Sequence, residues 1–341
     1  MINPDGSTNN RPVEPVVPPL PLKNGNGGTL IINASGSVDL VGTILPLLEG
    51  EEIRSSLNSV VGENAKGQGG NLVINAQKLN IREGAGISVG TFGQGNAGKL
   101  NVNAIDSIEV TGASGLGRAS EVSASVDAEA KGKGGDLIII AGLLRANNSG
   151  AITVSSQGVG RGGNLKVDAR SVVLENQGKL KAEAASGQGG NIMLNVQDLL
   201  LLRNGSKISA TAGTGRLGGD GGNISITTKF LVAIPKDNSD ISANAFSGDG
   251  GKVTLTSQGI FGLQFRPQLT DLSDITASSQ FGSNGIIIIN SPDTSFIQNS
   301  LNQLPKDAID TTKLLANTCI VRKDKPEGTF YITGTGGLPN G

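Results

Sequence analysis

A pair of glycines followed by a short alternating segment recurs along the chain, and it constrains the fold more than any other feature. The fullest copy is Gly69-Gly70-Asn71-Leu72-Val73-Ile74-Asn75-Ala76. Further copies, some of them weaker, begin at residues 27, 97, 134, 162, 189, 221, 250 and 284. Successive copies are separated by about 27 to 42 residues. Such a period is typical of solenoids, which grow by stacking similar units.

Each period holds three short segments in which apolar residues alternate with other residues. In the period that begins at Gly69, the apolar positions are Leu72, Ile74 and Ala76, then Leu79 and Ile81, then Ile87 and Val89. Alternation with a period of two predicts a strand with one buried face. Helical spacing is not seen in the repeats. Three short strands per period, joined by turns, predict one coil of a single-stranded parallel β-helix, with about eight coils between residues 27 and 290.

Composition supports a thin aliphatic interior and excludes several function classes. Hydrophobic residues make up 36% of the chain but aromatic residues only 3%, so Ile, Leu, Val and Ala must form the core. Glycine is abundant, at 52 of 341 residues, yet the strict order of collagen is absent. A net charge of −1 gives no reason to expect nucleic acid or an anionic membrane as partner. No apolar run approaches the roughly 18 residues of a membrane helix.

The chain has no histidine, and Cys319 is its single cysteine. An intrachain disulfide and a thiolate metal cluster are therefore excluded. We expect no cofactor and no metal site.

The two ends of the chain differ from the repeats. Residues 1–26 are rich in proline, which cannot donate a backbone hydrogen bond, and they are predicted to form an extended linker. Residues 291–341 follow the last repeat and are predicted to be a capping segment with a short helix, a strand and a loose tail. The first residues lack the charged start and apolar stretch of a signal peptide. We therefore expect the chain to be part of a longer exported protein.

Local sequence predicts how successive coils are joined. We expect each glycine pair to supply positive φ at the tight corner between coils. The Asn or Asp that follows the pair is expected to form a ladder of hydrogen bonds along the stack. Longer insertions at residues 44–66 and 259–267 are expected on the surface.

Three glycine-rich motifs imitate ligand-binding loops. The segments at residues 93–99 and 213–218 resemble phosphate-binding loops, but such a loop must be followed by a helix whose N-terminus meets the phosphate. A strand follows the first of them here. Residues 218–226 approach the calcium-binding nonapeptide of β-roll proteins, yet the consecutive nine-residue copies are missing. All three are interpreted as surface turns.

An enzyme on this fold would need converging acidic residues. Glycoside hydrolysis requires two carboxylates on neighbouring coils, and no histidine is present as a base. The outward acids are Asp106, Asp136, Asp168, Asp198, Asp220 and Asp249. Three of them, at 136, 220 and 249, lie near the glycine corner and could stack along one edge. Asn71, Asn164 and Asn191 take the corner place in other coils, which favours backbone hydrogen bonding over acid chemistry. No catalytic residue is therefore assigned.

The repeats also resemble a known family. The copy at residues 69–76, together with Gly90-Thr91-Phe92-Gly93-Gln94-Gly95-Asn96-Ala97-Gly98, is similar to the repeat of filamentous haemagglutinin-like exoproteins of two-partner secretion, most closely the large cyanobacterial members. The C-terminal region of those proteins is similar to residues 259–267, 273–282 and 332–339. The resemblance covers about residues 27–341. It implies a right-handed β-helix that a partner transporter exports through the outer membrane and that is displayed or released as an adhesin.

One feature of this family is missing from the chain. Family members begin with a signal peptide and a secretion domain that carries an Asn-Pro-Asn-Gly motif, to which Asn3-Pro4-Asp5-Gly6 is only faintly similar. We therefore expect the C-terminal part of a haemagglutinin-like protein without its secretion domain.

The expected function is that of a non-catalytic, monomeric rod, secreted or at the cell surface, that adheres to glycans or other surfaces through many weak contacts. An enzyme acting on extracellular polysaccharide is the first alternative, and an inert spacer or gene fragment is the second.

Overall fold

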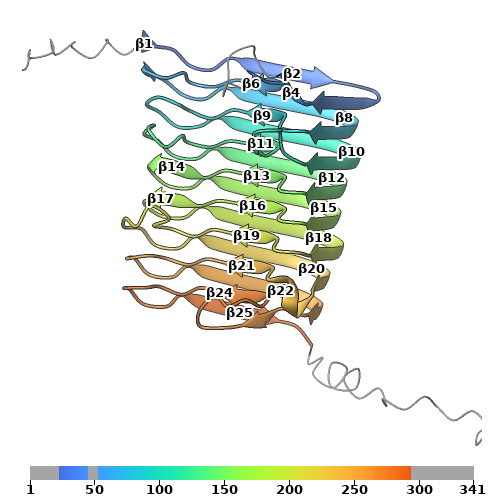
Figure 1. The fold of residues 1–341 in the computed structure, drawn as a ribbon, viewed down its shortest axis with the longest axis vertical. Coiled ribbons are helices and arrows are strands. Elements are labelled where there is room, and N and C mark those ends of the chain that lie inside the picture. The colour runs from blue at the N-terminus through green and yellow to red at the C-terminus, as the bar shows by residue number, and fades with distance from the viewer. Residues whose placement is uncertain (1–22, 45–52, 293–341) are drawn as a thin grey trace, which may run out of the picture. The chain divides into compact units, whose positions relative to one another are not determined.

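The computed structural model describes residues 23–44 and 53–292, which form a parallel β-helix (Figure 1). The principal sheet has the strand order β2-β8-β10-β12-β15-β18-β20-β22-β25, so strands that pair also follow one another along the chain. Each of these nine strands belongs to one coil, close to the eight expected. The predicted solenoid is therefore confirmed. The predicted capping segment lies outside the described residues from residue 293 onward.

The principal sheet contains the first and second alternating segments of every period. Its strands are β2 (Thr29–Asn33), β8 (Asn71–Arg82), β10 (Lys99–Thr111), β12 (Asp136–Asn147), β15 (Asn164–Glu175), β18 (Asn191–Leu202), β20 (Asn223–Ala233), β22 (Lys252–Phe261) and β25 (Ile286–Asn290), with β3 (Ser37–Val41) beside β8. Most coils thus have one long bent strand where the sequence predicted two short ones. In β10 the register shifts between Ala104 and Ser107, because β10 has three residues between the buried Ala104 and Ile108 whereas β12 has two between Ala141 and Leu144.

The third alternating segment forms a second sheet. Its strands in spatial order are β23 (Gln264–Phe265), β24 (Asp274–Thr276), β21 (Asp240–Ser242), β19 (Lys207–Ser209), β16 (Lys179–Lys181), β13 (Ala151–Thr153), β11 (Glu121–Ser123), β9 (Gly86–Ser88) and β6 (Ser56–Asn58). Three small sheets pair β1 (Lys23–Asn24) with β7 (Ala65–Lys66), β14 (Ser156–Val159) with β17 (Ala184–Ser186), and β4 (Thr43–Ile44) with β5 (Ile53–Arg54). One 3₁₀ helix, η1 (Pro235–Asp237), precedes β21. Strand pairing thus begins at Lys23, within the predicted linker, whose residues 1–22 are not described.

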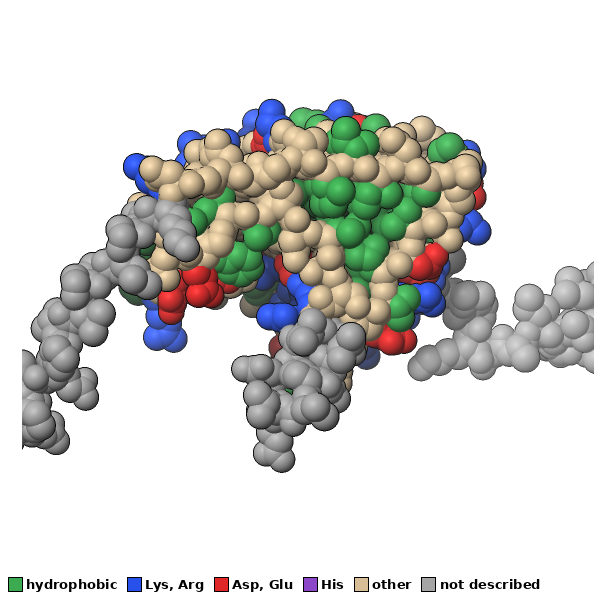
Figure 2. Space-filling view, turned by 90° about the horizontal axis from the view of Figure 1, so that it is seen from above, with side chains coloured by type: hydrophobic (Ala, Val, Ile, Leu, Met, Phe, Trp, Pro, Cys, Tyr) green, Lys and Arg blue, Asp and Glu red, His purple; other side chains and the backbone are tan. Residues whose placement is uncertain are grey.

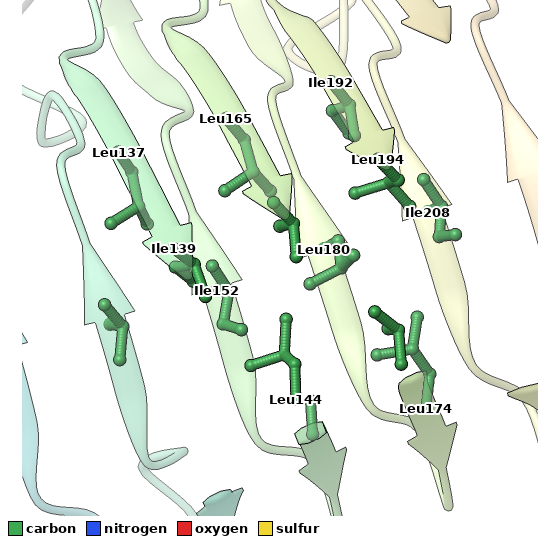
Figure 3. Packing of buried hydrophobic residues seen from close by; sticks show 14 of the residues in the cluster. Leu137, Ile139, Leu144, Ile152, Leu165, Leu174, Leu180, Ile192, Leu194 and Ile208 are labelled. Atoms are coloured by element: carbon green, nitrogen blue, oxygen red, sulfur yellow. The ribbon is translucent and has the colours of Figure 1, made fainter. Parts of the chain in front are cut away.

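The interior is built from stacked columns of aliphatic side chains (Figure 3). Leu100, Leu137 and Leu165 occupy the same register position on successive coils and are at most 1% exposed. In the described residues the buried hydrophobic side chains are Leu, Ile, Val and Ala alone, as the composition predicted. Each inner coil buries this surface against a coil on either side, at about 25 cal/mol per Å² of apolar area.

The first coil has a described neighbour on one side only. Figure 2 looks down on the end of the stack that carries β2 and shows hydrophobic side chains framed by backbone and polar groups. Leu30, Ile32 and Val38 belong to this coil and are only partly buried.

None of the helices in the described part of the chain is long and apolar enough to cross a membrane.

The glycine pairs stack in register, but the prediction that they supply positive φ is wrong. The glycines with positive φ in the described residues lie elsewhere, as at Gly84 and Gly95. The pairs are needed because the coils approach too closely for a side chain. A Cβ atom on Gly163 would lie 2.1 Å from the carbonyl oxygen of Gly135. The N–H of Gly163 also donates to the carbonyl oxygen of Val154 at 2.6 Å, which closes the coil.

The predicted ladder behind the glycine pairs is confirmed. The side-chain amide of Asn164 donates to Asp136 at 2.7 Å, that of Asn191 to Asn164 at 2.8 Å, and that of Asn223 to Asn191 at 2.9 Å. We call these four residues the amide ladder. Because each amide both donates and accepts, the ladder links four coils through side chains as well as through backbone pairing.

Candidate functional site

A groove follows the bend of the long strands along the stack. It has a volume of about 1120 Å³ and crosses six consecutive coils, from β10 to β22. At about 4.8 Å per coil it extends about 24 Å from the first strand to the sixth. We call it the bend groove.

The bend groove has two walls, mostly polar but with Ile105 and Ile140 at one end, and a floor of small side chains. One wall is formed by Asn103, Ile140, Asp168, Asn195, Thr227 and Thr256. The floor is formed by Ala104, Ala141, Ala169, Val196, Thr228 and Ser257. The other wall is formed by Ile105, Gly142, Arg170, Gln197, Asp198, Lys229 and Gln258. The floor residues are buried and point into the interior. Because their side chains are small, the backbone can lie closer to the axis of the stack at the bend.

The charges in the bend groove balance. Asp168 and Asp198 are offset by Arg170 and Lys229 among the residues that line it. Asp168 accepts a hydrogen bond from the amide of Asn195 at 2.7 Å and lies 2.9 Å from the ammonium of Lys166. Partial burial raises the pKa of Asp168, but the hydrogen bonds from Asn195 and Lys166 lower this pKa by more, so it lies below its usual value. Asp168 is therefore ionised at neutral pH and is suited to accept hydrogen bonds.

The six acids considered as catalytic candidates do not form one cluster. Asp168 and Asp198 line the bend groove, while Asp136 belongs to the amide ladder. Asp220 and Asp249 lie on successive coils, and each accepts a backbone N–H from the next coil, at 2.9 Å and 2.8 Å. The prediction of backbone bonding is thus confirmed for these last two. Asp106 is exposed at the bend of β10.

Two other acids, which the sequence analysis missed, do lie together. Asp240 on β21 and Asp274 on β24 are 2% and 0% exposed. The carboxylate of Asp274 pairs with Arg266 and accepts the hydroxyl of Thr270 at 2.8 Å. The ammonium of Lys207 lies 3.7 Å from Asp240. Burial raises the pKa of Asp240 above its usual value, and a backbone hydrogen bond from Asp274 offsets this in part.

The structure indicates an anchoring role for the buried carboxylate of Asp274. Arg266 belongs to the predicted insertion at residues 259–267, and its ion pair with Asp274 fixes this insertion to the second sheet. The other insertion is held in a similar way, because Arg54 lies 3.5 Å from Glu121. The sequence did carry a signal for the two buried acids. The same pattern, Ser-Asp-Ile followed by Ser or Thr and then Ala, occurs at residues 239–243 and 273–277.

The glycine-rich motifs contain no phosphate-binding geometry. Strand β10 begins at Lys99, directly after the first motif, where a helix would be needed. The second motif at residues 213–218 lies in a turn. Among the residues that the structure describes, no three His, Cys, Asp or Glu side chains are grouped so that they could hold a metal ion.

Comparison with known proteins adds no assignment: no protein-family model matches the chain, and neither a curated protein nor a solved structure is significantly similar to it.

Proposed function

We propose that the chain is a non-catalytic adhesive rod, part of a secreted or cell-surface protein that a two-partner secretion transporter exports. The single observation that carries this proposal is the repetition of polar side chains along one wall of the bend groove, at the same position on five of its six coils, with Ile140 at that position on the sixth. Each such contact is weak, but a stiff stack presents many of them at a fixed spacing. Simultaneous contacts raise the overall affinity without strengthening any one of them.

Two further observations support a binding role over a catalytic one. Of the two acids of the bend groove, Asp168 is held by Lys166 and Asn195. Asp240 and Asp274 are the neighbouring carboxylates that a glycoside hydrolase would need, but both are buried and Asp274 is bound by Arg266. The likeness of the repeats to haemagglutinin-like exoproteins agrees with an adhesive role.

Adhesion is tested by comparing a single rod with a multivalent display. The chain is biotinylated on an N-terminal tag, presented either alone or on streptavidin, and passed over surfaces coated with neutral polysaccharide, acidic polysaccharide or bacterial cells. We expect retention of the multivalent form to exceed that of the single rod by about 10²- to 10⁴-fold. Absence of retention on every surface would favour an inert spacer and would contradict the proposal.

The competing enzymatic function is tested in the same preparation. Polysaccharides are incubated with the chain and assayed for new reducing ends and for unsaturated products. We expect neither product. Catalytic release that is lost in Asp240→Asn or Asp274→Asn, with the fold intact, would replace the adhesive rod by a polysaccharide-cleaving enzyme.

A further inference from the structure

We propose that the bend groove binds one linear, uncharged polysaccharide chain that lies along the stack, with about one sugar unit beside each coil. This inference rests on the proposed adhesive function and adds a location, a ligand class and an orientation to it.

The shape of the bend groove selects a linear ligand. The groove crosses six coils, which repeat at about 4.8 Å. This repeat is close to the length of one pyranose unit in an extended glycan. A polymer of such units meets an equivalent wall position on every coil, whereas a compact ligand would leave most of the groove empty.

The walls offer the hydrogen-bonding groups that sugar hydroxyls need. Asn103, Gln197 and Gln258 carry amides, which donate and accept, and Thr227 and Thr256 carry hydroxyls, which do the same. A sugar hydroxyl also donates and accepts, so the coils that carry these five side chains can bond to it in either sense. The coil of β12 contributes Ile140, Ala141 and Gly142 to the groove and no such group. At one end of the groove, Ile105 and Ile140 are 64% and 48% exposed and present apolar surface to the C–H face of a sugar ring.

The charge balance favours an uncharged ligand. The lining holds two acids, Asp168 and Asp198, and two bases, Arg170 and Lys229. A polyanion such as nucleic acid or a uronic acid polymer gains affinity from an excess of cations, which this groove does not have. A neutral chain has no such requirement and can use the charged groups as hydrogen-bond partners.

The backbone pairing of the coils argues against a peptide as the ligand. Peptides that bind to sheets usually join an exposed edge through main-chain hydrogen bonds. The strands that line the groove, from β10 to β22, each pair with a strand on both sides. No edge is therefore open along the groove, and a ligand there depends on side-chain contacts, which suits a polyhydroxylated chain.

The length of the ligand provides the first test. Neutral glucan, xylan and mannan oligosaccharides, from disaccharides to octasaccharides, are titrated into the single rod and followed by calorimetry and NMR. We expect affinity to rise at least about tenfold from the disaccharide to the hexasaccharide, which is about 1.4 kcal/mol, and then to level off as the six coils are filled. Failure of all neutral series to bind, or affinity that is independent of length, would overturn the proposal.

Matched variants provide the second test. Gln197 and Gln258 line the groove, whereas Gln157 and Gln280 are exposed outside it. The groove variant Gln197→Leu/Gln258→Leu should lose at least about tenfold in affinity for the hexasaccharide, and the control Gln157→Leu/Gln280→Leu should stay within about twofold, on the scale at which tenfold is about 1.4 kcal/mol. Both should keep the far-UV dichroism and Tm of the wild type, since none of these four side chains makes a hydrogen bond within the described residues.

The outcomes separate this inference from the proposed function. Equal loss in both double variants, or binding of an acidic polysaccharide or a peptide at the groove in preference to the neutral chain, would overturn the groove inference even if the multivalent rod still adheres. Length-dependent binding that is lost only in the groove variant would support it even if the rod failed to adhere to every coated surface.

Discussion

The carboxylate of Asp240 accepts a hydrogen bond of 3.2 Å from the backbone N–H of Asp274, which lies one coil further along the stack. Asp240 is 2% exposed, and burial raises its pKa because its ionised form loses solvation. The folded state therefore binds more protons than the unfolded state at pH values between the two pKa values of this group. Across that range, stability falls as the pH rises.

Asp240→Asn should remove this cost of ionisation. The stabilising contribution of the protonated Asp240 is fully present below its unfolded pKa, about 3.9, and it is lost as the pH rises through the folded pKa. We therefore expect the free energy of unfolding of the variant to increase relative to that of the wild type from about pH 4 to about pH 7, so that the variant becomes the more stable of the two by comparison. Urea denaturation across this range measures the difference. A difference that stays constant, or that moves against the variant, would contradict the assignment.

Asp237, on the same coil, should show the opposite sign. A hydrogen bond of 2.6 Å from Arg203 lowers the pKa of Asp237 below its usual value. Its contribution to stability is therefore present above the unfolded pKa and is lost as the pH falls through the folded pKa. Relative to the wild type, Asp237→Asn should become less stable as the pH rises from about 3 to about 6. Urea denaturation of the Asp240 and Asp237 variants across this pH range measures how the free energy of unfolding of each differs from that of the wild type. The two differences should change with pH in opposite directions, and a change in the same direction would contradict the assignment.

The parts of the fold that could be predicted are those that alternation encodes directly. Whether Leu72 or Asn71 faces the interior follows from period two alone, and the recurrence of the pattern stacks like positions. The bend was not predicted, because the residues between the first and second alternating segments interrupt the alternation and so predict two separate strands, whereas the backbone continues through them as one long strand. The floor of the bend groove follows from that same bend.

The burial of the two carboxylates could not be predicted from alternation, although the repeated Ser-Asp-Ile segment marks both positions in the sequence. An Asp at the start of a short strand suggests an exposed outward position, as for other polar residues. What buries Asp274 is the insertion that carries Arg266 and the turn after it that carries Thr270, together with the coil that carries Asp240. Those contacts depend on how the insertion folds back, which alternation does not encode.

The close approach of the glycine pairs predicts a severe effect of the smallest side chain. In Gly163→Ala the new Cβ would meet the Gly135 carbonyl oxygen at 2.1 Å, a backbone atom that cannot move without disturbing the next coil. We expect the free energy of unfolding to fall by at least about 3 kcal/mol, the upper range for overpacking. Gly115→Ala is the control, since no heavy atom lies within 4 Å of its Cβ position. It should change stability by less than about 0.5 kcal/mol. Thermal and urea unfolding compare the two, and equal effects would show that the coils are not packed this closely.

The amide ladder should stabilise the stack by a measurable amount. Asn191 lies in the middle of the ladder, where it donates to Asn164 at 2.8 Å and accepts from Asn223 at 2.9 Å. Asn191→Ala removes both hydrogen bonds, and because these side chains are exposed to water we expect a loss of about 1 kcal/mol.

Asn101→Ala is the matched control for the ladder. Asn101 is exposed on the outward face of the same sheet, and its side chain makes no hydrogen bond within the described residues. Urea denaturation of both variants should show a loss in Asn191→Ala alone, with an unchanged dependence on denaturant because the surface exposed on unfolding is the same. Equal stability of the two variants would mean that backbone pairing and aliphatic stacking hold the coils in register without the ladder.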